Sequence, residues 1–282
     1  MDIRLLGDVE IESAGTTFTL ERSAERCVLA TLAFSTGHVV AVGTLVDHIW
    51  SDRPTTNAEQ TVASYVRTVR RVIERAGGGR DWLPNRRFDG YRLDIDPAMV
   101  DHRRFTDLSS TARHLASRAD HARAIEAYER ALGLWRGEAL ANVAGRWADG
   151  RRYRMRQERL AVTFELLDLL LRRGAYETVA GRAVDLVLEE PSDRALALAL
   201  RGLAGSGQKA LIQPFLNRAA ERMREVGGGR PSAEVVALAR KLTDSPVGDE
   251  LPFRGRQDDV ITMTATNAKN IYQASGDQYF ID

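Results

Sequence analysis

The stretch "PTTNAEQTVASYVRTVRRVIERAGGG", Pro54–Gly79, decides how the N-terminal part of this 282-residue chain folds. It opens on Thr-x-x-Glu, a spacing that can cap a helix reciprocally, and it closes on three glycines. We therefore predict one helix of about 20 residues, capped by Thr56 and Glu59. At 100° per residue, one half of this helix is apolar and should face a core. That half consists of Val62, Tyr65, Val66, Val69, Val72, Ile73 and Ala76.

The opposite half of the helix is rich in side chains that donate hydrogen bonds. It is centred on Gln60, Ser64, Arg67 and Arg71, with Thr61, Thr68, Arg70 and Arg75 at its flanks. Residues 60–92 carry eight arginines against three acids, whereas residues 1–59 carry four arginines against nine acids. This local excess of positive charge indicates a surface that faces a polyanion. The alternative is a solvated arginine-rich face, because all but three of the chain's 40 basic residues are arginine.

The segments around this helix predict the fold of the N-terminal domain. Residues 2–20 alternate apolar and polar side chains, which predicts two or three short antiparallel strands. Residues 22–37 and 42–52 show the apolar spacing of two further helices, and residues 80–96 predict a hairpin. Strands, three helices and a terminal hairpin make a winged helix-turn-helix. Its third helix would enter the major groove of DNA, and the wing would carry Arg86 and Arg87 at its tip.

From Pro97 onward the sequence is almost entirely helical in pattern. In "HARAIEAYERALGLWRG", Ala124, Tyr128 and Ala131 have the small-large-small spacing that lets paired helices nest. Helix–turn–helix units recur with a period of about 34 residues, which indicates a tetratricopeptide-like array. We expect Pro214 to distort the helix that contains it. An ordinary helical bundle is the alternative to the array.

These patterns predict an α+β chain in three parts. Residues 1–96 form the winged helix-turn-helix, residues 97–245 an all-α tetratricopeptide-like domain, and residues 246–282 a flexible or β-prone tail. Between Val260 and Gly276 the only charged side chain is Lys269, among Asn, Gln, Thr, Tyr and Ile. Such a composition is typical of segments that stack in register with copies of themselves. A disordered or strand-adding tail is the alternative.

Motif spacing argues against an enzyme, a metal site and a membrane protein. The "GSGQK" stretch at residues 205–209 lacks the gap and the hydroxyl of a phosphate-binding loop. The five histidines show no metal-ligand spacing with acids or with Cys27, the single cysteine, which we expect to be buried. No apolar run reaches the length of about 18 residues that a membrane span needs. We therefore predict no catalysis, no cofactor, no metal and no membrane contact, and a cytoplasmic location.

Five stretches, in their order along the chain, resemble one known family. They are "LVDHIW", "YVRTVRR", "GYRLDIDPAMVDHRRF", "ALGLWRGEAL" and "VGGGRPSAEVVALARKL". Residues 1–244 thereby resemble the Streptomyces antibiotic regulatory protein (SARP) family, whose members pair an OmpR-type winged helix with a tetratricopeptide-like bacterial transcriptional activation domain. The resemblance implies a transcriptional activator that binds repeated promoter sites and contacts RNA polymerase.

The recognition helix departs from the family's pattern. Where family helices usually have Tyr-Val-Ser-Arg-Leu-Arg-Arg, this chain has Arg67 and Thr68 in place of Ser and Arg. Ala63 stands where the family often has Gln. The family's base preference therefore does not transfer to this chain.

Two functions follow as predictions. The first is an activator at the nucleoid that binds double-stranded promoter DNA, self-associates there and contacts RNA polymerase holoenzyme. Its predicted DNA contacts are Gln60, Thr61, Ser64, Arg67, Thr68, Arg70, Arg71, Arg86, Arg87 and Arg92. By the resemblance, its polymerase contacts are Asp52, Arg53 and Thr55. The second is an adaptor whose helical array and tail recruit a signalling protein, but a scaffold does not need a concentrated arginine patch.

Overall fold

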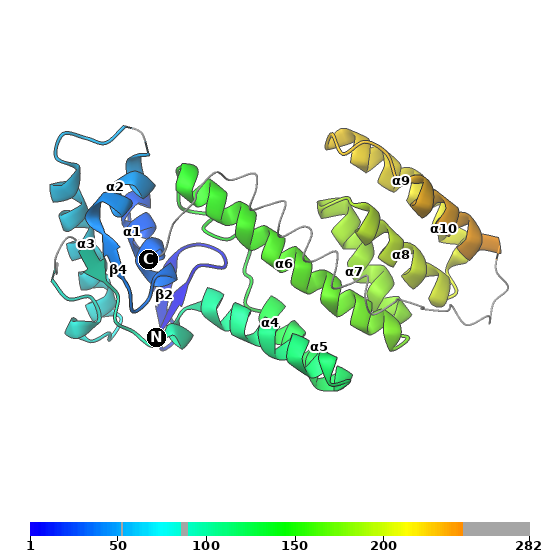
Figure 1. Ribbon diagram of the computed structural model, residues 1–282, viewed down its shortest axis with the longest axis horizontal. Helices are drawn as coiled ribbons and strands as arrows, with labels where there is room; N and C mark the ends of the chain where they lie inside the picture. The colour runs from blue at the N-terminus through cyan, green and yellow to red at the C-terminus, as the bar shows by residue number, and fades with distance from the viewer. Residues whose placement is uncertain (52, 86–89, 245–282) are drawn as a thin grey trace, which may run out of the picture. The chain divides into compact units, whose positions relative to one another are not determined.

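The computed structural model describes residues 1–51, 53–85 and 90–244 (Figure 1). Asp52, Arg86, Arg87 and the predicted tail over residues 246–282 lie outside the described residues. The chain divides into two compact units, one over Met1–Leu170 and one that begins at Leu171. The first unit holds the strands and the arginine-rich helix.

The first unit begins with a three-stranded antiparallel sheet, which confirms the strands predicted from the alternating pattern. Its strands, in order across the sheet, are β1 (Asp2–Arg4), β2 (Glu10–Ser13) and β3 (Thr16–Phe18). Ile3 lies opposite Ile11, and both side chains are fully buried. Ala14 and Gly15, both with positive φ, form the turn between β2 and β3. This register directs one face of the sheet into the core.

Three helices follow, at the positions that the apolar spacing predicted. They are α1 (Ser23–Phe34), α2 (Val42–Trp50) and α3 (Ala58–Arg75). On α3 the predicted apolar half is buried, except that Tyr65 is half-buried and stacks on Trp50 with ring centroids 6.3 Å apart. The amphipathic period of this helix therefore gives its core face correctly.

The predicted capping box of α3 is wrong. The N-cap is Asn57 rather than Thr56, and no side chain caps the helix. The Ala58 N–H donates to the Thr55 carbonyl oxygen at 3.1 Å, so Thr56 belongs to a turn that precedes the helix. The predicted glycine stop is confirmed: the N–H groups of Gly77 and Gly78 donate to the Glu74 and Ile73 carbonyl oxygens, which is a Schellman motif.

The predicted hairpin over residues 80–96 is also wrong in its first arm. Arg80–Trp82 form a short 3-10 helix, η1, and β5 (Gly90–Arg92) pairs instead with β4 (Val39–Ala41), a strand that we did not predict. A side chain at Gly90 would lie 2.3 Å from the Val40 carbonyl oxygen, so the close pairing requires glycine there. β5 therefore takes a partner from before α2 rather than from its own sequence neighbourhood.

The remainder of the first unit is helical. After the short η2 (Pro97–Met99) come α4 (Asp101–Ser117), α5 (His121–Leu132) and the long α6 (Arg146–Arg172), which runs on to the start of the second unit. Helices α4 and α5 lie side by side (Figure 1). Ala124, Tyr128 and Ala131 of α5 are buried, as the small-large-small spacing predicted.

One buried carboxylate joins the start of α4 to the end of β1. Asp101 is fully buried and accepts hydrogen bonds from the backbone N–H groups of Leu5 (2.8 Å) and Leu6 (3.1 Å). The Arg136 guanidinium donates to the same carboxylate at 3.0 Å, and the Arg136 backbone N–H donates to the Leu6 carbonyl oxygen. β1, α4 and the segment after α5 therefore meet at one ion pair.

A cluster of rings joins α1 and α2 to the N-terminal end of α6. The His48 imidazole stacks on Trp147 with centroids 4.7 Å apart, and its Nδ1 lies 3.1 Å from the Thr31 hydroxyl. Phe34 packs edge-on against Trp147, and the Arg151 guanidinium lies 4.7 Å from the Phe34 ring centroid. Burial, and secondly the charge of Arg151, lower the pKa of His48 to about 4. The ring is therefore neutral near pH 7.

The second unit consists of paired helices. They are α7 (Tyr176–Glu189), α8 (Asp193–Gly205), α9 (Ile212–Glu225) and α10 (Ala233–Asp244), with the short η3 (Lys209–Leu211) before α9. Helices α7 and α8 pack closely, since a side chain at Gly202 would lie 2.5 Å from the Ala180 nitrogen. The distortion predicted at Pro214 is wrong. Pro214 lies in the first turn of α9, where a backbone N–H has no acceptor within the helix.

The predicted fold class is confirmed: a small N-terminal α+β domain of the winged-helix type precedes a helical domain. The boundary at residue 96 stays a prediction. Among the described residues, no helix is both long and apolar enough to span a membrane.

We expect Gly202→Ala to destabilise the second unit, because the added methyl group would overlap Ala180. Overpacking of this kind costs about 1–3 kcal/mol of unfolding free energy. Gly181→Ala is the matched control, since Gly181 of α7 has open space around it. That change should be neutral or stabilising by up to about 1 kcal/mol, because alanine favours a helix. Equal free energies of urea unfolding for the two variants would contradict the close packing of α7 on α8.

We expect His48 to make folding stability fall as the pH drops from about 6.5 to about 4. The unfolded chain protonates this ring near its ordinary value of 6.5, whereas the folded chain protonates it only near 4, so acid favours the unfolded chain in that window. His48→Gln should flatten the dependence of unfolding free energy on pH between those values. His114→Gln, at an exposed position on α4, should keep the wild-type dependence. Identical pH curves for wild type and His48→Gln would rule out the buried neutral ring.

Candidate nucleic-acid interface

The outer face of α3, namely Gln60, Ser64, Arg67 and Arg71, is exposed along its whole length. The flanking Thr61 and Thr68 are half-buried, and their hydroxyls donate to the carbonyl oxygens of Asn57 (3.0 Å) and Ser64 (3.4 Å). Their oxygens can still accept hydrogen bonds from a ligand. The face therefore offers donors along its centre and acceptors at its flanks.

Arg70 has a different environment from the other arginines of α3. It is half-buried, and its Nε and Nη2 donate to the carbonyl oxygens of Leu83 (2.6 Å) and Pro84 (3.0 Å). These two bonds hold the segment after η1 against α3. Sequence reasoning placed Arg70 on a phosphate and did not foresee this contact, which depends on a chain reversal after Gly79.

Arg92 lies in β5, half-buried, and forms an ion pair with the Asp94 carboxylate. Its charge is thus partly balanced within the protein. Arg86 and Arg87, the predicted tip of the wing, lie outside the described residues. The phosphate contacts predicted for these three arginines stay predictions.

A hollow opens between the second half of α3 and η1, and we name it the arginine hollow. It is lined by Arg67, Arg70, Arg71, Glu74, Arg80, Asp81, Pro84 and Asn85. Sequence reasoning counted Arg80 in the basic cluster but named neither Arg80 nor Asn85 as a contact. The three glycines at the end of α3 could have predicted this hollow. A glycine turn after a helix can reverse the chain, so that the following residues run back along the same helix.

The arginines of this surface are mostly not neutralised by the protein. Among the residues that the structure describes, Arg67, Arg71 and Arg80 form no ion pair with a carboxylate, and all three are exposed. Exposed guanidinium groups in a concave surface attract anions, and planar donors suit phosphate and guanine edges. The surface can therefore bind a polyanion.

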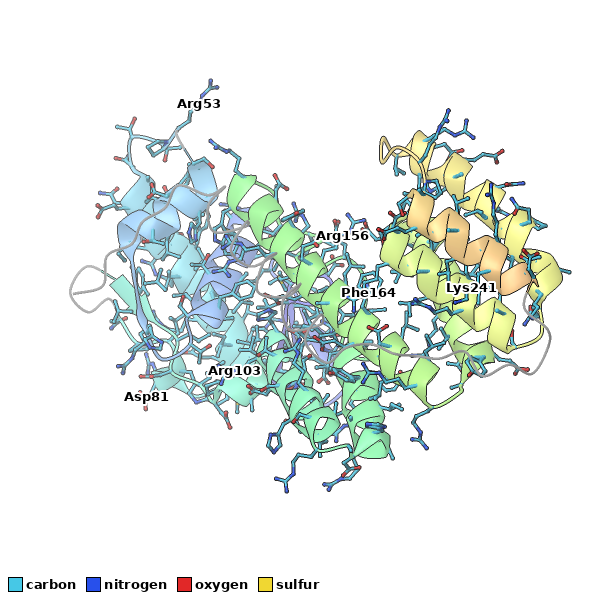
Figure 2. All side chains as sticks on the ribbon, turned by 45° about the vertical axis from the view of Figure 1, so that its right-hand side comes forward. Arg53, Asp81, Arg103, Arg156, Phe164 and Lys241 are labelled. Carbon is cyan, nitrogen blue, oxygen red and sulfur yellow. The ribbon has the colours of Figure 1, made fainter. Side chains whose placement is uncertain are left out.

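The loop between α2 and α3 lies beside this interface. Arg53 and Thr55 are exposed, and Asp52 lies outside the described residues. Figure 2 shows Arg53 projecting away from the helices. The loop is held at its start, where the Arg53 N–H donates to the Trp50 carbonyl oxygen at 3.2 Å, and at its end by the turn before Ala58.

Neither a reactive thiol nor a metal-binding cluster accompanies this surface in the described residues. Burial raises the pKa of the Cys27 thiol to about 12, so it stays protonated and unreactive. No group of three or more His, Cys, Asp or Glu side chains within residues 1–51, 53–85 and 90–244 is placed to hold a metal ion. The site's chemistry is that of charge and hydrogen-bond donors.

Comparison with known families divides the chain in two. Residues 16–93 match the family described as the C-terminal part of transcriptional regulatory proteins, and residues 100–243 match the bacterial transcriptional activator domain. The transcriptional regulator RedD of Streptomyces coelicolor is 30% identical over 241 residues, which cover 83% of this chain and 67% of RedD. The regulatory protein AfsR of Streptomyces griseus is 26% identical over 239 residues, but the chain spans only 24% of AfsR.

A solved structure shares the fold. Mycobacterium tuberculosis EmbR, in complex with a low affinity phosphopeptide, superposes with a TM-score of 0.76 at 20% identity. The superposition covers 96% of this chain and 70% of EmbR.

The matched families and relatives are transcriptional regulators and not enzymes, as the sequence predicted. With a DNA-binding domain of the OmpR type followed by a bacterial transcriptional activator domain, the chain belongs to the SARP family of transcriptional regulators.

Proposed function

We propose that this protein is a sequence-specific transcriptional activator that binds repeated promoter sites and contacts RNA polymerase in the cytoplasm, at the nucleoid. The observation that carries the proposal is the exposed outer face of α3, which continues into the arginine hollow. A helix of this kind fits the major groove, and the flanking cations fit the phosphates on either side.

The side chains of the outer face suit base edges. Arg67 and Arg71 can each donate two bonds to a guanine, and Gln60 can bond an adenine in the same bidentate way. Ser64 and the half-buried Thr61 and Thr68 complete the set. Arg86, Arg87 and Arg92 are proposed to contact phosphates. Arg70 stays in the proposed set, although its bonds to Leu83 and Pro84 leave three of its five N–H donors for DNA.

Repeated sites follow from the size of the recognition element. A single helix contacts few base pairs, so discrimination across a genome needs two or more copies on neighbouring sites. The helical domain supplies surface for contacts between copies. Self-association on DNA is therefore part of the proposal.

The polymerase contact is proposed for the loop between α2 and α3. Exposed Arg53 and Thr55, together with Asp52, would lie beside the DNA-bound helix, within reach of a polymerase subunit bound to the same promoter.

We expect Arg67→Ala and Arg71→Ala to cost about 1–3 kcal/mol of binding free energy each and to blur base preference, because each removes a base contact. Arg87→Ala should weaken binding to all duplexes alike. The measurement is fluorescence anisotropy with the protein's own upstream DNA and an unrelated duplex at several salt concentrations. Log affinity should fall with log salt by about 0.9 per phosphate contact. Equal behaviour of the three variants, or binding that is insensitive to salt, would contradict the assignment.

We expect the double substitution Asp52→Ala and Arg53→Ala to abolish activation and to leave DNA affinity unchanged, because the loop lies outside the DNA-facing surface. Transcription in vitro from a target promoter reports activation, and anisotropy reports affinity. A parallel loss of DNA affinity would show that the loop has only a structural role.

A second candidate function is the adaptor, which the amide-containing stretch between Val260 and Gly276, with Lys269 as its only charged side chain, favours. Deletion of residues 246–282, outside the described residues, separates the two functions. The activator proposal expects unchanged cooperativity of DNA binding and loss of any thioflavin-positive assembly at high protein concentration. Loss of cooperativity would instead favour the adaptor, with the tail as the organising element.

A further inference from the structure

The arginine hollow carries cations that the recognition of bases does not use. Arg67 and Arg71 belong to the outer face of α3, but Arg80 lies on the opposite wall, on η1. Arg80 is exposed, and within the described part of the chain it forms no ion pair with a carboxylate. It is therefore an exposed cation beside α3, on a side where a DNA backbone would run if α3 entered the major groove.

The backbone before Arg80 is fixed by close contacts. A side chain at Gly78 would lie 2.5 Å from Ile73 Cγ2, and one at Gly79 would lie 2.9 Å from Trp82 Nε1. The Trp82 N–H donates to the Gly79 carbonyl oxygen at 3.1 Å, and the Trp82 carbonyl oxygen accepts from the Asp94 N–H at 2.7 Å. These contacts hold η1 between α3 and the segment just after β5. The backbone that carries the Arg80 side chain is therefore rigid.

The backbone after Arg80 is fixed by Arg70. Its guanidinium bridges the carbonyl oxygens of Leu83 and Pro84, and the Leu83 side chain is fully buried. A lysine ammonium can donate to carbonyl oxygens, but it lacks the rigid planar fork that fixes the direction of both bonds. Arg70 therefore holds the segment just after η1 against α3, at one side of the hollow.

We propose that the arginine hollow seats one backbone phosphate of the bound duplex, with Arg80 as its contacting cation, Asn85 as a second donor and Arg70 as the positioning residue. The inference rests on the proposed DNA-binding function. The charges agree with it, because four arginines line the hollow against the carboxylates of Glu74 and Asp81. The surplus attracts an anion, a concave surface focuses that attraction, and guanidinium groups suit phosphate oxygens.

The two carboxylates explain why the seat suits a phosphate within DNA rather than a free anion. They weaken the attraction for any isolated anion, whereas a duplex adds its own contacts to the outer face of α3. They also supply a reciprocal test. Removing a carboxylate should strengthen DNA binding if the duplex lies over the hollow. This gain should shrink on a duplex whose phosphate over the hollow is made neutral, and it should not shrink if the hollow faces only salt solution.

The first experiment pairs protein variants with a chemically altered duplex. Single methylphosphonates, which are neutral, replace the phosphates of the target site one at a time. We expect one position where neutralisation weakens binding of the wild type but not of Arg80→Ala. Arg80→Ala should also lower the slope of log affinity against log salt by about 0.9 and weaken cognate and unrelated duplexes by the same factor. Arg75→Ala, an exposed arginine of α3 that does not line the hollow, should keep the wild-type sensitivity at that position.

The positioning role of Arg70 is tested on the same set of duplexes. Arg70→Lys keeps the charge but loses the fork, so it should lose the sensitivity at the one position that couples to Arg80. A general loss of structure would weaken binding at every position instead, and thermal unfolding of each variant checks for it. If Arg70→Lys kept the wild-type sensitivity to a methylphosphonate at that position, the positioning role of Arg70 would be overturned.

The second experiment uses Glu74→Gln, which should tighten binding to every duplex, with Glu126→Gln on α5 as the control that should not. Two results would overturn the inference: no methylphosphonate position that couples to Arg80, or no gain from Glu74→Gln. The proposed function fails separately, if the wild type shows no preference for its target duplex. A wild type that binds specifically and is weakened by Arg67→Ala, but shows no coupling to Arg80, would leave that function standing and remove only the phosphate seat.

Discussion

The buried carboxylate of Asp101 is the interaction on which the first unit depends. A carboxylate in the protein interior is costly unless hydrogen bonds and an opposite charge satisfy it. Here two backbone N–H groups, of Leu5 and Leu6, and the Arg136 guanidinium do so. Loss of the carboxylate would leave the two backbone N–H groups without this partner in the core. The sheet, α4 and the segment after α5 are therefore held at one point, and residues 1–170 form one compact unit.

This junction shows what two of the motifs that carried the family resemblance do in the structure. "VDHRRF" contains Asp101 and also Arg104, whose guanidinium pairs with Asp2 of β1 at 2.7 Å. "LWRG" contains Arg136 and also Trp135, whose ring meets Phe105 of α4 edge-on at 5.4 Å. Both motifs thus lie where the winged helix meets the helical domain. They specify how the DNA-binding part is attached and not what it binds, whereas the departures from the family lie on α3.

Local sequence patterns correctly predicted those features of the fold that depend only on neighbouring residues. The wheel of α3 gave its buried and exposed halves, because an amphipathic period needs no knowledge of distant residues. The predictions that failed depend on residues far away in the sequence or on the exact start of a helix. β5 pairs with a strand about 50 residues earlier. The effect of Pro214 depends on where α9 begins. In the candidate site, the exposure of Arg67 and Arg71 followed from the wheel. The bonds of Arg70 did not, because they require the fold of the chain beyond Gly79.

The balance of charge at the interface has a consequence for discrimination between DNA sequences. Electrostatic attraction to phosphates acts on every duplex, so a surface with many unopposed arginines binds non-specific DNA strongly. In this protein Asp94 pairs with Arg92, and Glu74 and Asp81 lie in the arginine hollow. These acids lower the general attraction while the outer face of α3 keeps its donors. Under the proposed function, a single copy would hold DNA weakly unless the bases match, and binding of several copies to repeated sites would amplify that difference.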